Sequence, residues 1–185
     1  MEKYSKAKNR IAELISIVLN PVLMVVLMLF ALSFANPISF LRLLFIMLPF
    51  FAATAAYVGV RAYILKDSDL DLSKLESRRY LGITSFGGVL VSSIFCYFLY
   101  PTLLPLFVYI GVIILFSGII SLFWKISFHA IGYSALCVSF FRLFGPISLL
   151  LVLLVPILFW ARLRLKKHTI WQLIAGSLLG LVFLI

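Results

Sequence analysis

Charged side chains are scarce in this chain. Only 12% of its 185 residues are charged and 64% are hydrophobic, whereas a soluble domain carries about a quarter charged residues. Acidic groups are especially few, with six Asp and Glu against 16 Lys and Arg, and there are only two His. This composition excludes a water-soluble globular domain and indicates a basic membrane protein.

Cysteine is rare as well. Cys96 and Cys137 each lie inside an apolar run, where a free cysteine behaves as a small hydrophobe. Two isolated cysteines provide neither a disulfide framework nor metal-ligand spacing. Asp67, Asp69 and Asp71 alternate in one charged loop, which we interpret as helix capping or pairing with arginine. The sequence therefore predicts no metal site.

What the sequence does contain is a series of long apolar runs. A transmembrane helix needs about 20 residues, and six uncharged runs reach or approach that length. The longer three are Leu14–Ala35, Tyr80–Tyr100 and Leu103–Trp124, and the shorter three are Leu43–Val60, Leu143–Ala161 and Thr169–Ile185. The first run is too long for a signal peptide and lacks a small-residue cleavage site, so we expect one retained helix there.

A shorter segment is a seventh candidate. It starts near Ser127 and ends at residues 144–146, "FGP", because proline cannot continue a helix and glycine tolerates unusual dihedral angles. Turns are also expected at residues 35–39 and around Pro101 and Pro105. The predicted fold class is all-α, a polytopic transmembrane helix bundle of six to seven spans. Seven crossings, or six with one re-entrant segment, both fit the pattern.

The chain shows no internal repeat and no low-complexity linker, so we treat residues 1–185 as a single integral membrane domain. Within it we distinguish an N-terminal helix pair, 1–66, from a core, 67–185. If the crossings alternate, every Lys and Arg except Arg42 and Arg142 falls on the face of the N-terminus. The positive-inside rule makes that face cytoplasmic, which predicts an inner or plasma membrane protein with this orientation.

Three basic segments meet on that charged face in the predicted topology. They contribute Lys74, Arg78 and Arg79; Lys125, Ser127 and His129; and Arg162, His168 and Gln172. Arginine presents a planar fork of donors that matches phosphate oxygens, and lysine adds a point charge. Free backbone N–H groups at a helix start would add further donors. The pattern predicts a binding site for a phosphate-like anion.

The spacing of two residues in the third segment also suggests catalysis. His168 and Gln172 are four residues apart and therefore share one face of a helix. A Gln carbonyl can accept a hydrogen bond from one imidazole nitrogen, which leaves the other nitrogen able to attack an electrophile. His129, the second histidine, could protonate the leaving oxygen.

These residues resemble the signatures of the type 2 phosphatidic acid phosphatase superfamily. The third signature reads Ser-Arg, five residues, His, three residues, Asp, and the chain has Ala161-Arg162, His168 and Gln172 at the same spacing. The small residues Ala175 and Gly176 follow, and we interpret Gly176 with Gly180, spaced as Gly-x-x-x-Gly, as a face for close helix packing. The resemblance covers about residues 66–185.

Two further signatures match in part. The middle signature is Pro-Ser-Gly-His, and "ISFH" keeps Ser127 and His129 at the same spacing. The first signature, Lys, six residues, Arg-Pro, is hinted at in "KLESRRY", where Lys74 lies closer to Arg79 and Tyr80 replaces the proline.

The resemblance implies metal-independent, cofactor-free dephosphorylation of a lipid phosphate or pyrophosphate, of the phosphatidic acid, phosphatidylglycerol phosphate or prenyl phosphate type. It implies that His168 forms a phosphohistidine, that His129 is the general acid, and that Arg162, Arg79 and Lys74 hold the phosphoryl oxygens. The expected partners are the lipid substrate and the bilayer, with no nucleic acid.

Two alternatives stay open at this point. A phosphotransferase on the same scaffold would hand the phosphoryl group to an acceptor alcohol. A catalytically weak homologue would only bind the lipid phosphate, an idea prompted by Gln172, which replaces the family's Asp and removes its negative charge. A transporter fits less well, because the charged groups gather at one rim rather than at the midplane between repeats.

Overall fold

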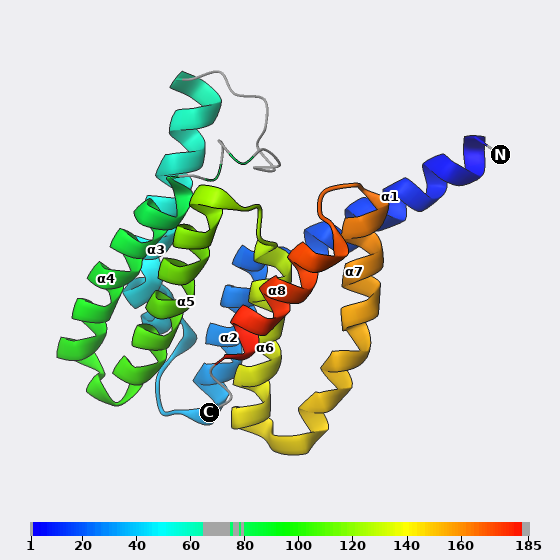
Figure 1. Ribbon diagram of the computed structural model, residues 1–185. Coiled ribbons are helices and arrows are strands. Elements are labelled where there is room, and N and C mark those ends of the chain that lie inside the picture. The colour runs from blue at the N-terminus through cyan, green and yellow to red at the C-terminus, as the bar shows by residue number, and fades with distance from the viewer. Residues whose placement is uncertain (1, 65–74, 76–77, 79, 183–185) are drawn as a thin grey trace. The chain divides into compact units, whose positions relative to one another are not determined.

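The structure is a computed structural model that describes residues 2–64, 75, 78 and 80–182 (Figure 1). These residues form helices and no strand, which confirms the all-α class. The α-helices are α1 (Glu2–Val18), α2 (Pro21–Ala35), α3 (Phe40–Gly59), α4 (Leu81–Leu99), α5 (Leu104–Phe123), α6 (Phe128–Phe144), α7 (Val155–Arg164) and α8 (Ile170–Leu181). The shorter helical segments are η1 (Val60–Ile64), η3 (Pro101–Leu103) and η4 (Gly145–Leu154).

Several of the helices are long and apolar enough to cross a bilayer. Among the described residues four stretches qualify by length and composition: Phe40–Ile64, Leu81–Leu99, Pro101–Phe123 and Phe128–Arg164. A fifth is counted if α1 and α2 together form one bent span. The chain is therefore an integral membrane protein. The predicted count of six to seven is higher, partly because it counted the 12-residue α8 as a crossing.

The limb after α6 turns back at the predicted glycine-proline pair. Gly145 caps α6 with φ of 72°, a left-handed conformation that glycine adopts readily. The following segment, η4 and then α7, runs back beside α6 (Figure 1). Tyr133 on α6 donates its hydroxyl hydrogen to the carbonyl of Leu151 at 2.7 Å and so ties the two limbs together.

The first apolar run is not one continuous helix, so that prediction was wrong. The chain bends by 43° between α1 and α2. Asn20 caps α2, its side chain accepting a hydrogen bond from the Val22 N–H at 2.9 Å, and Pro21 occupies the first turn. Proline fits the first turn of a helix because its missing N–H would have no partner there, but inside a helix it breaks the hydrogen-bond ladder.

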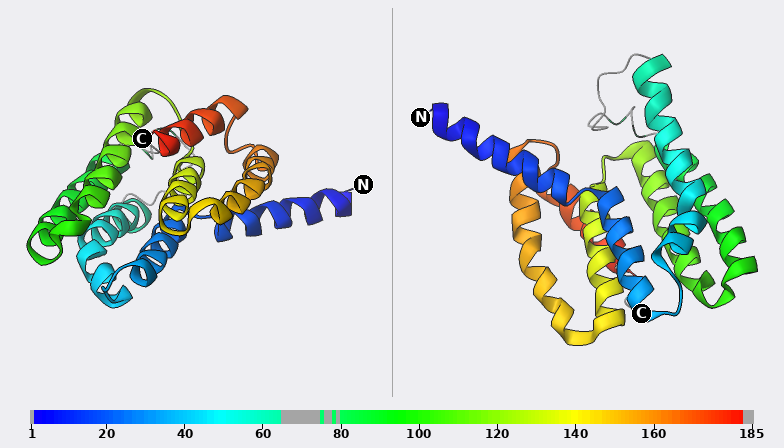
Figure 2. Two further views of the ribbon diagram at one scale, coloured as in Figure 1. Left: turned by 90° about the horizontal axis from the view of Figure 1, so that it is seen from below. Right: turned by 180° about the vertical axis from the view of Figure 1, so that it is seen from behind.

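The described chain forms two compact units, Met1–Phe40 with Ile126–Ile185, and Leu41–Lys125. The predicted single domain, with its division near residue 66, stays a prediction. In the first unit α6 lies between α2 and α8, while α1 packs against α7 (Figure 2). Both ends of the chain therefore build one unit around α6.

Close backbone approach brings α8 onto α6. A Cβ added to Gly176 would lie 2.7 Å from the carbonyl oxygen of Ser127, and one added to Gly180 would lie 2.5 Å from that of Ile131. Neither position has room for a larger residue. This confirms the interpretation of Gly176 and Gly180 as a Gly-x-x-x-Gly packing face, and it fixes the start of α8 beside the start of α6.

The second unit contains α3, α4 and α5. The last two helices are joined through η3 and pack closely where Gly82 meets Gly118. Near the start of α3, Arg42 donates a hydrogen bond to the Tyr100 hydroxyl at 2.8 Å. Near the middle, the hydroxyls of Thr54 and Ser85 lie 3.0 Å apart and join α3 to α4.

Candidate active site

Two predicted site residues meet around one serine of α1. The Arg162 guanidinium, on α7, donates a hydrogen bond from NH1 to the Ser16 hydroxyl at 3.0 Å. The His129 ring, on α6, places Nε2 3.2 Å from the backbone carbonyl oxygen of Ser16. Arg162 is 1% exposed and His129 is 8% exposed. The first unit thus brings an arginine and a histidine from distant parts of the sequence into one buried cluster.

The contact with Ser16 also places a proton on His129. A carbonyl oxygen can only accept a hydrogen bond, so His129 Nε2 must carry the hydrogen in this contact. In the neutral ring the other nitrogen, Nδ1, then carries the lone pair.

A tight turn carries the chain from Arg162 to His168. α7 ends at Arg164, and Lys166 has a φ of 53°, in the left-handed region. The Lys167 N–H then donates to the carbonyl of Arg162 at 3.1 Å. This bond returns the chain to the end of α7, so His168, which is 6% exposed, follows directly after a residue bonded to Arg162.

His168 is oriented by Gln172, as the spacing predicts. His168 Nδ1 lies 3.2 Å from Gln172 Oε1. The same oxygen accepts the backbone N–H of Thr169 at 3.1 Å, while Thr169 Oγ1 accepts the N–H of Gln172 at 3.4 Å. These reciprocal bonds form a capping box at the start of α8.

The capping box determines the His168 tautomer. A backbone N–H can only donate, so the Gln172 atom that faces Thr169 must be the oxygen and not the amide nitrogen. That oxygen can in turn only accept from His168, and Nδ1 must therefore carry the hydrogen. In the neutral ring the lone pair is then on Nε2. One cap at the start of α8 thus leaves the lone pair of the neutral ring on Nε2.

Ser127 joins the two histidine-bearing helices. It caps α6, its side chain accepting the Ala130 N–H at 3.4 Å, as the predicted helix start near Ser127 requires. Its own N–H donates to the Gln172 carbonyl at 3.3 Å. The residue is fully buried. A direct backbone bond therefore holds the starts of α6 and α8 together, within two residues of each histidine.

The first unit carries a surplus of positive charge. Among the side chains described there, residues 6–40 and 126–182, Glu13 supplies the one carboxylate, and it is exposed. The cations of the same ranges are Lys6, Lys8, Arg10, Arg142, Arg162, Arg164, Lys166 and Lys167. A buried arginine in this setting favours an anionic ligand, and ionisable groups inside membrane proteins are commonly functional.

The remaining predicted residues fall outside this cluster. Arg78 and Lys125 belong to the second unit, so the first unit does not contain them. Arg78 is buried, and its backbone N–H donates to the Leu75 carbonyl at 3.0 Å. Lys74 and Arg79 lie outside the described residues. Their predicted roles in binding phosphate stay predictions.

Ser16 was not anticipated. It lies in the first apolar run, outside the region of family resemblance, and a serine among apolar residues has no motif to distinguish it. The available signal was weak: Ser16 is a hydroxyl within about a turn of Glu13, near the charged face. Its role follows from the packing of α1 against α7, which no local pattern encodes.

Comparison with known proteins adds no relative. No family model, curated protein or solved structure matches this chain. Its function must therefore be argued from its own residues.

Proposed function

We propose that the chain is a membrane phosphatase that hydrolyses a lipid phosphate or pyrophosphate through a phosphohistidine on His168. The observation that carries this proposal is the capping box of α8. It fixes the His168 tautomer with the lone pair on Nε2, next to the end of the helix that bears the buried Arg162. A nucleophile, an orienting partner and an anion-binding group are the components that phosphoryl transfer through histidine requires.

The first step forms the phosphoenzyme. His168 Nε2 attacks the phosphorus, a P–N bond forms, and the P–O bond to the lipid breaks. The lipid oxygen leaves with a proton from His129, which becomes neutral. In the second step water attacks the phosphorus, His129 takes a proton from that water, and the P–N bond breaks. Phosphate is released, and the two histidines return to their starting states.

Arg162 stabilises the charge that develops during both steps. Its guanidinium carries five N–H donors in a fixed plane, and Ser16 Oγ accepts one of them. This contact holds the plane in place before the substrate arrives. A preorganised donor aimed at the phosphoryl oxygens costs little reorganisation at the moment of reaction. Ser127 at the start of α6 would contribute a further hydroxyl.

The substrate class follows from the setting of the site. A chain with apolar spans and a basic rim attracts anionic lipids, by about 1 kcal/mol for each Lys or Arg near the surface. We place the site on the cytoplasmic face of the inner or plasma membrane, because the basic residues gather on the face of the N-terminus. Phosphatidic acid, phosphatidylglycerol phosphate and prenyl phosphates all belong to this class.

The test uses the full chain reconstituted in vesicles with EDTA present. We expect inorganic phosphate to be released from at least one of these lipid phosphates, and a brief incubation with substrate carrying ³²P in its phosphate to leave an acid-labile, alkali-stable label on the protein. A requirement for a divalent metal, or a label that is stable in acid, would contradict the mechanism. Adding glycerol as an acceptor separates hydrolysis from the phosphotransferase alternative, which would yield glycerol phosphate.

Gln172 favours one competing function, phosphate binding without turnover. Its amide orients His168 but carries no charge to stabilise the imidazole as it becomes phosphorylated. We expect Gln172→Glu, which has the same length and also suits a capping box, to raise the rate of phosphoenzyme formation by about tenfold, because the carboxylate stabilises the positive charge that develops on the ring; tenfold corresponds to about 1.4 kcal/mol off the barrier. Gln172→Leu should lower it by a similar factor because the orienting bond is lost.

The paired variants distinguish the two functions. Both should keep the α8 packing at Gly176, so lipid-phosphate binding should change little, and only the chemical step should respond. If phosphate binds tightly to the unmodified chain, no phosphoenzyme forms, and Gln172→Glu does not restore one, the binding-only function is the correct one.

A further inference from the structure

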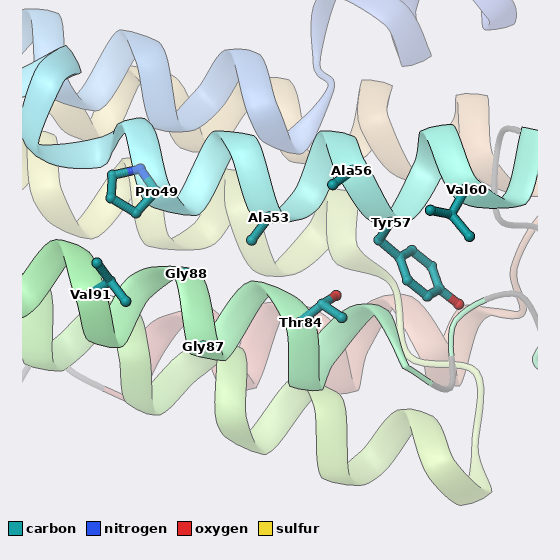
Figure 3. Close-up of a pocket in the computed structure, with 9 residues that line it drawn as sticks. All are labelled: Pro49, Ala53, Ala56, Tyr57, Val60, Thr84, Gly87, Gly88 and Val91. Atoms are coloured by element: carbon teal, nitrogen blue, oxygen red, sulfur yellow. The ribbon is translucent and has the colours of Figure 1, made fainter.

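A groove runs between α3 and α4 in the second unit (Figure 3). Its volume is about 590 Å³, within the roughly 300–1,000 Å³ range of ligand sites. The groove is lined by Pro49, Ala53, Ala56, Tyr57 and Val60 from α3 and η1, and by Thr84, Gly87, Gly88 and Val91 from α4. Tyr57 and Thr84 supply the polar groups, both toward the same end (Figure 3).

Small residues create the space. A Cβ on Gly88 would lie 2.7 Å from the Pro49 carbonyl oxygen and 2.8 Å from Phe50 Cα. The backbones of α3 and α4 are therefore in contact at Gly88, and this contact forms the bottom of the groove. The preceding residue, Gly87, has nothing within 4 Å of an added Cβ. Gly87 therefore forms an open wall, and a larger side chain there would fill the groove without meeting backbone.

The groove matches the depth of one leaflet. Arg42 and Arg61 stand 19 residues apart on the helical segment Phe40–Ile64, a span of about 28 Å at 1.5 Å per residue. That is close to the hydrocarbon thickness of about 30 Å, so each arginine reaches one interface. The α3 lining extends from Pro49 to Val60, about 16 Å, and so covers the half of the span that ends at Arg61.

One cation, Arg61, lies beside the Tyr57 end of the groove. The Arg61 guanidinium carbon lies 5.9 Å from the centre of the Tyr57 ring, which lines the groove. A cation held over an aromatic face at this distance is in a favourable cation–π geometry. The groove thus has an apolar body of one-leaflet length and a positive charge at the headgroup level.

We propose that this groove binds an anionic diacyl phospholipid, with one acyl chain along Gly87 and Ala53 and its phosphate beside Arg61. An acyl chain fits the apolar body of the groove. The positive charge of Arg61 at its end favours an anionic headgroup over a zwitterionic one. The site is separate from His168 and Arg162, which lie in the other unit. It does not depend on the proposed phosphatase activity.

The experiment measures binding and not turnover. The full chain is reconstituted in phosphatidylcholine vesicles with a trace of phosphatidylglycerol that carries a photoreactive group in one acyl chain, and the labelled peptides are located by mass spectrometry. We expect label in residues 49–60 and 84–91. Unlabelled phosphatidylglycerol should compete about fivefold better than phosphatidylcholine, the preference that one interfacial arginine supplies.

Three variants sharpen the result. Gly87→Leu should reduce labelling of the groove by about tenfold, because the new side chain displaces several methylene contacts. Gly59→Leu is the matched control, since Gly59 also has open space around it but does not line the groove, and labelling should be unchanged. Arg61→Gln should keep the labelling but abolish the advantage of phosphatidylglycerol.

Either of two outcomes overturns the proposal. Full labelling of the groove in the Gly87→Leu variant would show that the lipid's acyl chain lies elsewhere on α3 and α4. Equal competition by phosphatidylcholine and phosphatidylglycerol in the unmodified chain would show ordinary contact with bulk lipid. Because no outcome involves phosphate release, the result stands whether or not the histidine site is an enzyme.

Discussion

Replacing His168 with asparagine is expected to abolish phosphate release from lipid phosphates, with a loss of at least about a thousandfold, as for other catalytic nucleophiles. Asparagine retains an N–H donor close to the position of Nδ1, so the bond to Gln172 Oε1, 3.2 Å in the structure, can persist. It has no counterpart of Nε2. The variant therefore removes the attacking nitrogen while leaving the start of α8 capped.

The measurement is phosphate release together with ³²P labelling of the protein. Thermal unfolding in detergent, compared with the unmodified chain, shows that the capping box survives. Adding free imidazole to His168→Gly supplies a second control, since a small nucleophile entering the vacated space should restore part of the activity. Turnover at the original rate in His168→Asn would exclude His168 as the nucleophile.

Replacing Arg162 with methionine is expected to lower kcat by roughly a hundred- to a thousandfold, the usual effect of removing one preorganised donor from a transition state. Methionine has a similar length and no charge, so it suits a position that is 1% exposed. The expected loss arises because the phosphoryl oxygens lose a donor that Ser16 holds in place at 3.0 Å.

Arg164 provides the matched control for this substitution. It lies two residues further along α7, is exposed, and donates from Nε to Asn9 Oδ1 at 3.0 Å. Arg164→Met removes the same charge from the same helix and should change kcat by less than about threefold, because substitutions of exposed side chains usually have small effects. Equal losses in the two variants would mean that Arg162 acts through the overall charge and not through the site.

Much of the local geometry of the site could be predicted from sequence because it depends on short-range rules. The four-residue spacing of His168 and Gln172 requires a shared helix face, and the structure has that contact. Ser127 was expected to begin a helix, and it caps α6. Gly176 and Gly180 were expected to allow close packing, and both do so.

What sequence reasoning missed depends on tertiary contacts or on a signal that hydropathy hides. Ser16 acquires its role only because α1 packs on α7. The break at Asn20-Pro21 was readable as a cap followed by a first-turn proline, yet a continuous apolar window conceals it. The number of spans depended on helix lengths, as for the 12-residue α8, and composition alone does not specify these.

The way the units are threaded through the chain has a consequence for biosynthesis. Residues 41–125 are contiguous, so the second unit can assemble as soon as they leave the ribosome, since domains generally fold as units during synthesis. The first unit cannot assemble as early. Ser16 is made early, but its partner Arg162 on α7 emerges 146 residues later. The α1 helix therefore enters the membrane before its final neighbour α7 has been made.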